Sequence, residues 1–132
     1  MIEWDKKFEI GHPRIDFEHQ IFLGLILDFK AMAVEGKAPE RLLRILNEIV
    51  KYAEFHFVSE ENIMLDCGYP LYAEHVGHHQ ALLSRLRAKC ADLRTNVISP
   101  LDLYEFLFDW FALHTSQEDK KIAQYLQMGA EK

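Results

Sequence analysis

The sequence predicts an all-α protein: an up-down-up-down bundle of four helices with an N-terminal arm. Two observations carry this prediction. Apolar residues recur over long stretches at alternating spacings of four and three, which is the period of a helix buried along one side. Short segments containing Gly or Pro separate these stretches, and such short connections join antiparallel neighbours in a bundle. We found no strand-like alternation, internal repeat or low-complexity linker.

The helix ends can be placed from capping signals. We expect Asp16 to cap the first helix, Pro39 to open the second, the third to begin near Leu71, and Ser99-Pro100 to start the fourth. Glycines are expected to end three of these helices: Gly36, Gly68 and Gly129. The 132 residues therefore divide into an arm over 1–15 and a bundle over 16–129, expected to form a single domain.

Composition argues against several classes of function. The formal net charge of −6 disfavours a nucleic-acid binder and provides no basic patch for an anionic membrane. No run of about 18 apolar residues could span a membrane, and the acidic N-terminus is unlike a signal peptide. Cys67 and Cys90 are expected to lie too far apart for a disulfide. Two free thiols are typical of a cytoplasmic protein.

The second helix carries polar residues inside its apolar seam. His56 and Glu60 are four residues apart, so they lie on one face of the helix, one turn from each other. The seam that contains them reads Leu42, Leu46, Ile49, Ala53, His56, Glu60 and Ile63. Because a buried glutamate is costly unless it is paired or bound to a metal, Glu60 must have partners elsewhere in the chain.

All four predicted helices place such residues at one level. Counted at about 1.5 Å per residue, these residues fall within about 20 Å of the same end of the bundle. They are His19, His56, Glu60, His75, His79, His114 and Asp119. Imidazole and carboxylate ligands without thiolate suit iron, manganese or zinc. Seven side chains exceed the needs of one tetrahedral zinc, so two ions bridged by the carboxylates fit better.

A structural role is the alternative reading of each residue. A single buried histidine is more often a hydrogen-bonded core residue than a ligand, and a pair four residues apart can be a surface pair. The coincidence of seven residues on four seams argues against this alternative. His78 shares a heptad position with Arg85 and Asp92 and is assigned to the solvated face, while His12, before the first helix, is expected at the surface.

Together these residues resemble the hemerythrin family. The matching elements are His19, His56-x3-Glu60, His75-x3-His79, His114-x4-Asp119, and around them Trp4-Asp5, Gly68-Tyr69-Pro70 and Asp119-Lys120-Lys121. The resemblance covers essentially the whole chain, and its length is similar to that of bacterial members. It implies a non-haem pair of iron ions that binds O2 reversibly, for oxygen storage, transport or delivery.

The resemblance also implies roles for single residues. His75, His79 and His114 would bind one iron, and His19 and His56 the other. Glu60 and Asp119 would bridge the two ions, together with an oxo or hydroxo group. Five histidines and three bridges fill eleven of twelve octahedral positions, so one position next to His19 and His56 would accept O2. The apolar O2 pocket would be formed by Phe22, Phe57 and Trp110.

The segment from His114 to Asp119 departs from expectation in two ways. The two residues are five apart, about 140° around a regular helix, so we predict a one-residue π-bulge that returns both to the core. The residues between them are Thr115, Ser116, Gln117 and Glu118, where an apolar residue facing the site is expected. If Ser116 or Gln117 reached the pocket, water could enter and shorten the lifetime of bound O2.

Two other functions remain as alternatives. A di-iron oxidase or peroxidase of the ferritin type would need two Glu-x-x-His motifs, and the chain has one match, Glu9-x-x-His12, in the arm. An O2 or redox sensor would normally be fused to a signalling module, for which no residues are left. We therefore expect a monomer that binds O2 and is not an enzyme, and its protein partner would be one that receives O2.

Overall fold

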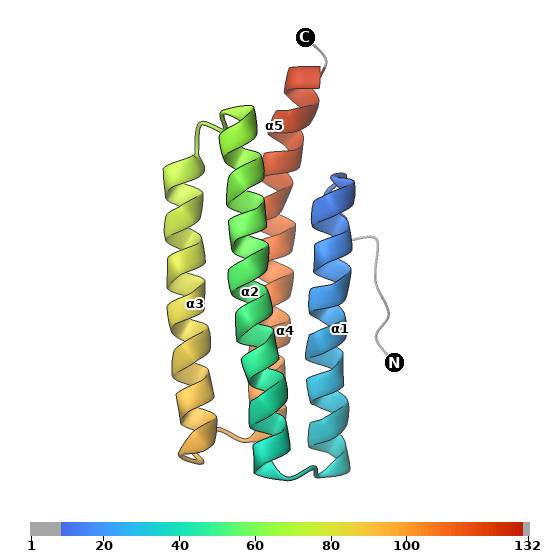
Figure 1. The fold of residues 1–132 in the computed structure, drawn as a ribbon, viewed down its shortest axis with the longest axis vertical. Coiled ribbons are helices and arrows are strands. Elements are labelled where there is room, and N and C mark those ends of the chain that lie inside the picture. Colours follow the sequence, from blue (N-terminus) through green and yellow to red (C-terminus); the bar gives the residue numbers. More distant parts are fainter. Residues whose placement is uncertain (1–8, 131–132) are drawn as a thin grey trace.

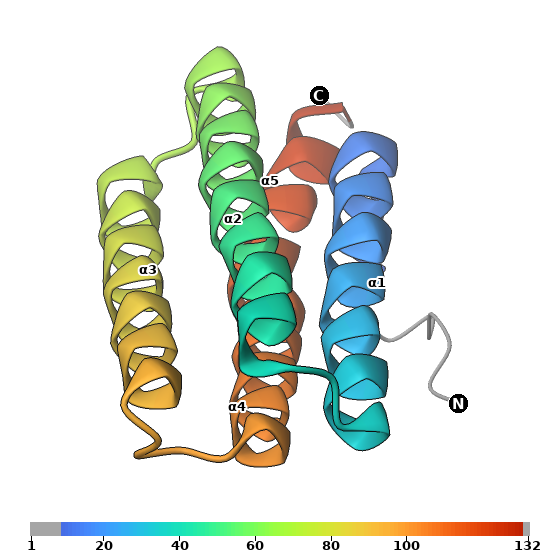
Figure 2. The same ribbon diagram turned by 60° about the horizontal axis from the view of Figure 1, so that its bottom comes forward.

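The computed structural model describes residues 9–130, apart from the side chains of Ser116 and Ala130. Its helices are α1 (Pro13–Glu35), α2 (Pro39–Cys67), α3 (Tyr72–Arg94), α4 (Pro100–Leu113), the π-helix η2 (His114–Asp119) and α5 (Lys120–Ala130). Because α4, η2 and α5 continue one another, the described residues form four antiparallel rods joined by short turns (Figure 1). The view turned by 60° shows the same up-down-up-down order (Figure 2). The predicted four-helix bundle is confirmed.

Most helix ends follow the predicted capping signals, but the predicted end at Gly129 was wrong, because α5 runs through this residue to Ala130. Ser99 accepts a hydrogen bond from the Asp102 amide at 3.2 Å, and Pro39 and Pro100 each occupy the first position of a helix. Gly36 and Gly68 end α1 and α2 in the left-handed conformation, with φ of 72° and 67°, which a residue with a Cβ adopts at a cost.

The predicted N-cap at Asp16 was wrong. Helix α1 begins at Pro13, and its N-cap is His12, whose Nδ1 accepts a hydrogen bond from the Ile15 amide at 3.3 Å. The Asp16 carboxylate instead accepts hydrogen bonds from the amides of Ile10 and Gly11, at 2.8 and 3.2 Å. Proline suits the first helical turn, so the helix starts within the predicted arm, and Asp16 holds the preceding backbone against it.

The core is apolar along most of the bundle and polar near one end. Phe22, Ile26, Leu46, Ile49 and Leu107 are each almost completely buried in its main apolar cluster. A smaller cluster packs Ile10 of the arm against Ile15 and Ala123, as expected for an apolar arm residue. The other arm residues expected to pack there, Trp4 and Phe8, lie outside the described residues.

The two cysteines, Cys67 and Cys90, are free, as predicted. None of the helices within residues 9–130 combines the length and the apolar character needed to cross a membrane.

Connectivity brings the polar seam residues to one level. The start of α1, the end of α2, the start of α3 and the η2–α5 segment share one end of the bundle (Figure 1). Each rod contributes its part of the polar seam near that end. The capping signals and turns thus fix the depth of the site before any side-chain contact is considered.

Candidate metal centre

The seven predicted residues gather into two groups of potential metal ligands. Each residue of a group offers a ligand atom, and these atoms lie within 4.8 Å of one another. One group consists of Glu60, His75, His79, His114 and Asp119, and the other of His19, His56, Glu60 and Asp119. All seven side chains are at most 8% exposed. The two carboxylates belong to both groups and so stand between three histidines on one side and two on the other.

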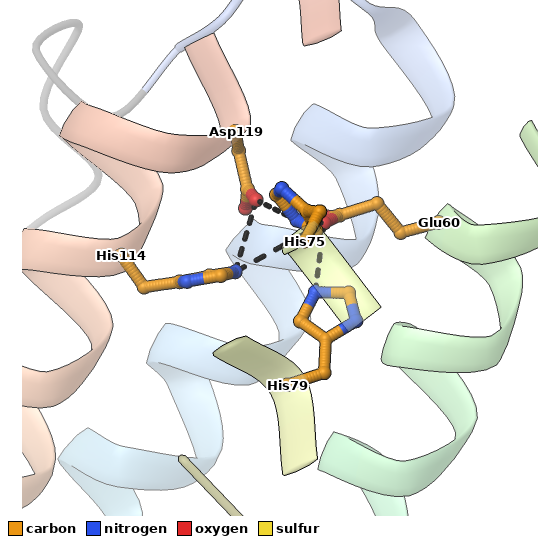
Figure 3. A group of neighbouring side chains, drawn as sticks. All are labelled: Glu60, His75, His79, His114 and Asp119. Atoms are coloured by element: carbon orange, nitrogen blue, oxygen red, sulfur yellow. Dashed lines mark hydrogen bonds and ion pairs between the residues drawn. The ribbon is translucent and has the colours of Figure 1, made fainter. Parts of the chain in front are cut away.

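The three-histidine group is drawn in Figure 3, where side chains from α2, α3 and η2 point toward a common centre. Glu60 Oε1 lies 2.6 Å from His75 Nε2 and 3.0 Å from His79 Nε2. Asp119 Oδ1 lies 3.0 Å from His114 Nε2 and 3.3 Å from His75 Nε2. One oxygen of each carboxylate therefore faces this group.

The other oxygens of the same carboxylates face the two-histidine group. Asp119 Oδ2 lies 2.9 Å from His19 Nε2, and Glu60 Oε2 lies 3.2 Å from His56 Nε2. The Nε2 atoms of His19 and His56 are themselves 3.0 Å apart. This division of oxygens between two sets of imidazoles is the arrangement that a pair of bridging carboxylates requires.

The predicted π-bulge is confirmed and explains how His114 and Asp119 reach the same centre. Residues His114–Asp119 form one π-helical segment between α4 and α5. The wider turn accommodates one extra residue, so both side chains are buried although five positions separate them. If this segment were a regular α-helix of the same length, Asp119 would point away from His114, whose Nε2 lies 3.0 Å from Asp119 Oδ1.

Several buried polar atoms in this cluster lack a hydrogen-bond partner of acceptable geometry. They are His19 Nδ1, Glu60 Oε2, His114 Nε2, Asp119 Oδ1 and Asp119 Oδ2. All of these except His19 Nδ1 lie 2.9–3.2 Å from a ligand atom of another residue of the cluster. Unpaired buried oxygen and imidazole nitrogen atoms are costly, and metal ions would satisfy them. The residues present therefore fit a two-metal centre.

The histidines and carboxylates of the cluster shift each other's pKa strongly. Burial alone would lower the pKa of His114, but the negative charge of Asp119 raises it to about 10. Burial would likewise lower the pKa of His56, and its hydrogen bond to Glu18 raises it to about 9. Burial would raise the pKa of Glu60, yet the surrounding imidazoles hold it well below its usual range. The buried carboxylates thus stay negative and attract cations.

Two glutamates that orient metal-facing histidines were missed by the sequence analysis. Glu18 Oε1 lies 2.7 Å from His56 Nδ1, and Glu61 Oε2 lies 2.7 Å from His79 Nδ1. Each carboxylate accepts a hydrogen bond from Nδ1–H, which leaves Nε2 free to face the centre. Glu18 is itself held by Ser59 Oγ at 2.8 Å and by Arg14 at 3.1 Å. The available signal was their position beside His19 and Glu60 in the sequence.

A small internal cavity adjoins the two-histidine group. Its lining comprises His19, Phe22, His56, Phe57, Trp110, Phe111, His114 and Thr115. All three residues predicted for the O2 pocket are among them. The free volume open to the centre of a water-sized molecule is about 10 Å³, which is about the space that one such molecule needs.

The polar segment after His114 contributes Thr115 to the described lining of this cavity. Thr115 lines it and is 1% exposed, whereas Gln117 is exposed and lines a different, outer groove. The concern that Gln117 reaches the pocket was therefore wrong, and the side chain of Ser116 lies outside the described part of the chain. The wide π-turn after His114 is where the chain places Thr115 toward the core.

The outer groove lies between α3 and α4 and has a volume of about 410 Å³. Two of its lining residues, Trp110 and His114, also line the internal cavity, so they stand between the cavity and the groove. His78, which was assigned to the solvated face, lies at this groove with a side chain 42% exposed and 3.3 Å from Glu118. It belongs to neither ligand group.

Comparison with known proteins gives a consistent result. A family model described as "Hemerythrin HHE cation binding domain" matches residues 11–126. The chain is 24% identical over 127 residues to Bacteriohemerythrin of Clostridium acetobutylicum, covering 92% of this chain and 98% of that protein. It is 28% identical over 119 residues to Myohemerythrin of Sipunculus nudus, covering 89% and 88%. Bacteriohemerythrin of Campylobacter jejuni is 23% identical over 129 residues, with 93% of each chain covered.

Proposed function

This chain belongs to the hemerythrin family, and we propose that it binds O2 reversibly at two iron ions held by the two ligand groups. When bound, the iron pair supplies the electrons that a reversible O2 complex needs. One observation carries the proposal. Each of the two carboxylates, Glu60 and Asp119, has one oxygen facing the three-histidine group and the other oxygen facing the two-histidine group.

The ligand assignment follows from this division. His75, His79 and His114 are proposed to hold one iron, His19 and His56 the other, and Glu60 and Asp119 to bridge them. Nitrogen and carboxylate oxygen ligands without thiolate suit iron. Glu18 and Glu61 accept hydrogen bonds from Nδ1–H of His56 and His79, which leaves each Nε2 as the ligand atom.

The cavity supports binding of O2 on the two-histidine side. That side has two imidazoles where the other has three, so a metal ion held there would have fewer protein ligands and more room for O2. The cavity is lined by both of these histidines, His19 and His56, and by only His114 of the other group. Its small volume and the aromatic rings of Phe22, Phe57 and Phe111 suit a diatomic guest and leave little room for an organic substrate.

The surrounding residues are proposed to keep water out of the site. Trp110 is 6% exposed, and its indole Nε1 donates a hydrogen bond to the Leu82 carbonyl at 3.2 Å, which fixes the ring between cavity and outer groove. Exclusion of water disfavours the departure of a charged, reduced form of O2 into the pocket. Exclusion of water would therefore favour a carrier over an oxidase.

An optical titration tests the proposal. The iron-loaded protein is reduced without air, exposed to O2, and then returned to an O2-free atmosphere. A visible spectrum that appears and disappears over repeated cycles, with two irons per chain, is the expected result. Prompt one-way oxidation in the first cycle would instead favour a di-iron oxidase, a peroxidase or a redox sensor.

The wider role is proposed as storage or delivery of O2 by a cytoplasmic monomer. The two unpaired cysteines are compatible with a reducing compartment. Sedimentation of the iron-loaded protein tests the monomer. Transfer of O2 from it to a purified acceptor tests delivery, and a failure of transfer to any acceptor would leave storage as the function.

A further inference from the structure

Thr115 is an unusual member of the cavity lining. Among the described residues that line this cavity, it is the polar aliphatic side chain that belongs to neither ligand group. Its neighbours there are aromatic rings and the three imidazoles. It is 1% exposed, so solvent outside the protein does not reach it. A polar group in this place is within reach of a guest in the cavity.

The hydroxyl of Thr115 has no hydrogen bond to any described residue. A threonine inside a helix usually donates to the carbonyl four residues earlier, as Thr95 does to Ala91 at 3.1 Å. Thr115 lies in the π-helical segment and makes no such bond. A buried hydroxyl without a partner is destabilising, and a valine of the same shape would avoid this cost.

We propose that the Thr115 hydroxyl donates a hydrogen bond to the outer atom of the ligand bound in this cavity. The site would then select small ligands whose outer atom carries negative charge, such as azide and O2 that has accepted electrons. A hydrogen bond to a charged acceptor is stronger than one between neutral groups. The inference rests on the proposed function, because it needs a ligand on the His19 and His56 side.

Thr115 would thereby be a ligand-contacting residue that sets specificity without binding metal. The two rings beside it, Phe111 and Trp110, cannot take this role. The first has no polar atom in its side chain, and the indole of Trp110 already donates to Leu82. Within the described lining, the hydroxyl is the remaining side-chain donor outside the ligand groups.

Azide binding to the oxidised, iron-loaded protein tests the proposal. We expect Thr115→Val to weaken azide binding about 10- to 100-fold, the loss of one hydrogen bond to a charged group. Thr115→Ser keeps the hydroxyl and is expected to stay within about threefold of the wild type, less than the cost of a lost hydrogen bond. Iron content should be the same in all three proteins, because Thr115 belongs to neither ligand group.

Two further measurements separate a hydrogen bond from a change of shape. The infrared stretch of bound azide should shift on transfer from H2O to D2O in the wild type and in Thr115→Ser, but not in Thr115→Val. In the metal-free protein, Thr115→Val should melt at the same temperature or a few degrees higher, because an unpaired hydroxyl is removed.

The outcomes are distinguishable from failure of the proposed function. A wild-type protein that holds iron but binds neither azide nor O2 would end both proposals. Normal azide binding with an equal or tighter affinity in Thr115→Val would overturn only the role of Thr115, and would indicate that the hydroxyl holds a water molecule. Absence of the D2O shift in the wild type would overturn it as well, without recourse to any variant.

Discussion

At the scale of single residues, the metal centre depends on hydrogen bonds that the periodicity of the sequence does not reveal. The ligand histidines present Nε2 to the centre, and for two of them a buried or half-buried glutamate holds Nδ1 at 2.7 Å. Trp110 depends on a single hydrogen bond from its ring to a backbone carbonyl of α3. These contacts orient groups that would otherwise have freedom to turn, and each can be removed separately.

We expect Glu18→Gln to weaken metal binding by about 10- to 100-fold, the usual cost of losing a group that orients a metal ligand. The amide no longer carries the charge that fixes the protonated Nδ1 of His56. Competition between the protein and a chelator measures the change. The matched control is Glu35→Gln, at a glutamate of the same helix whose side chain is 60% exposed, and it should leave affinity unchanged. Equal affinities for both variants would contradict the orienting role.

Replacing Trp110 by alanine should join the internal cavity to the outer groove, because Trp110 lines both. Water then reaches the site, and we expect autoxidation of the O2 complex to become several-fold faster with both irons still bound. The decay of the oxygenated spectrum measures this. Phe106→Ala, which enlarges only the outer groove, is the control. If both variants autoxidise at the same rate, Trp110 is not the barrier.

At the scale of elements, the notable feature is the π-helix inside the last rod. It places His114 and Asp119 in one centre while α4 and α5 each keep their own apolar face toward the core. Leu107 of α4 and Ile122 of α5 are both completely buried, although the register between them is that of a helix with one extra residue. The extra residue is therefore absorbed within six positions.

Deletion of the exposed Gln117 should convert η2 to a regular α-helix, with His114 and the former Asp119 four residues apart on one face. The bundle should remain folded and cooperative. Deletion of the exposed Asp109 in α4 should instead rotate all later residues by about 100° and remove both from the core. Thermal melting followed by circular dichroism compares the two. Similar destabilisation by both deletions would contradict the view that η2 holds an inserted residue.

At the scale of the whole molecule, stability and metal binding are linked. Buried carboxylates and imidazoles at the level of the site take the place of apolar packing, and several of their atoms are unpaired. The binding energy of ions in such a place is in part folding energy. The main apolar cluster, in contrast, consists of hydrophobic residues that offer no such unpaired polar atoms.

Removal of metal should therefore lower the melting temperature. Ligands present at about 1,000 times their dissociation constant stabilise a protein by about 4 kcal/mol, which corresponds to more than about 10 °C for a domain of this size. Calorimetry of the iron-loaded and metal-free proteins measures the difference. Coincident melting curves would show that the polar seam residues do not need metal.

The metal-free protein should also lose stability at high pH. The pKa of His56 and His114 is raised from 6.5 to about 9 and about 10 by nearby carboxylates. Groups with a raised pKa stabilise the fold fully below about pH 6.5, and this contribution is lost as the pH rises through about 9 and 10. The melting temperature should fall between about pH 7 and pH 10. A constant or rising melting temperature over this range would contradict the raised values.

Much of the architecture followed from local chemistry. The four helices, most of their ends and the depth of the seven polar residues could be predicted, because seam periodicity and capping act within a few turns of one chain segment. The π-bulge was predicted for the same reason, since the five-residue spacing of His114 and Asp119 conflicts with a regular helix. The error at Asp16 was also local, because His12 and Pro13 compete for the same helix start.

The contacts that could not be predicted from the sequence are those set by the rotation of the helices relative to each other. Glu18 reaches His56 across two helices, and Thr115 reaches the cavity because the π-turn directs it inward. Such contacts depend on side chains far apart in sequence, 38 positions for Glu18 and His56. Periodicity tells which face of a helix is buried, whereas only packing decides which neighbour each buried side chain meets.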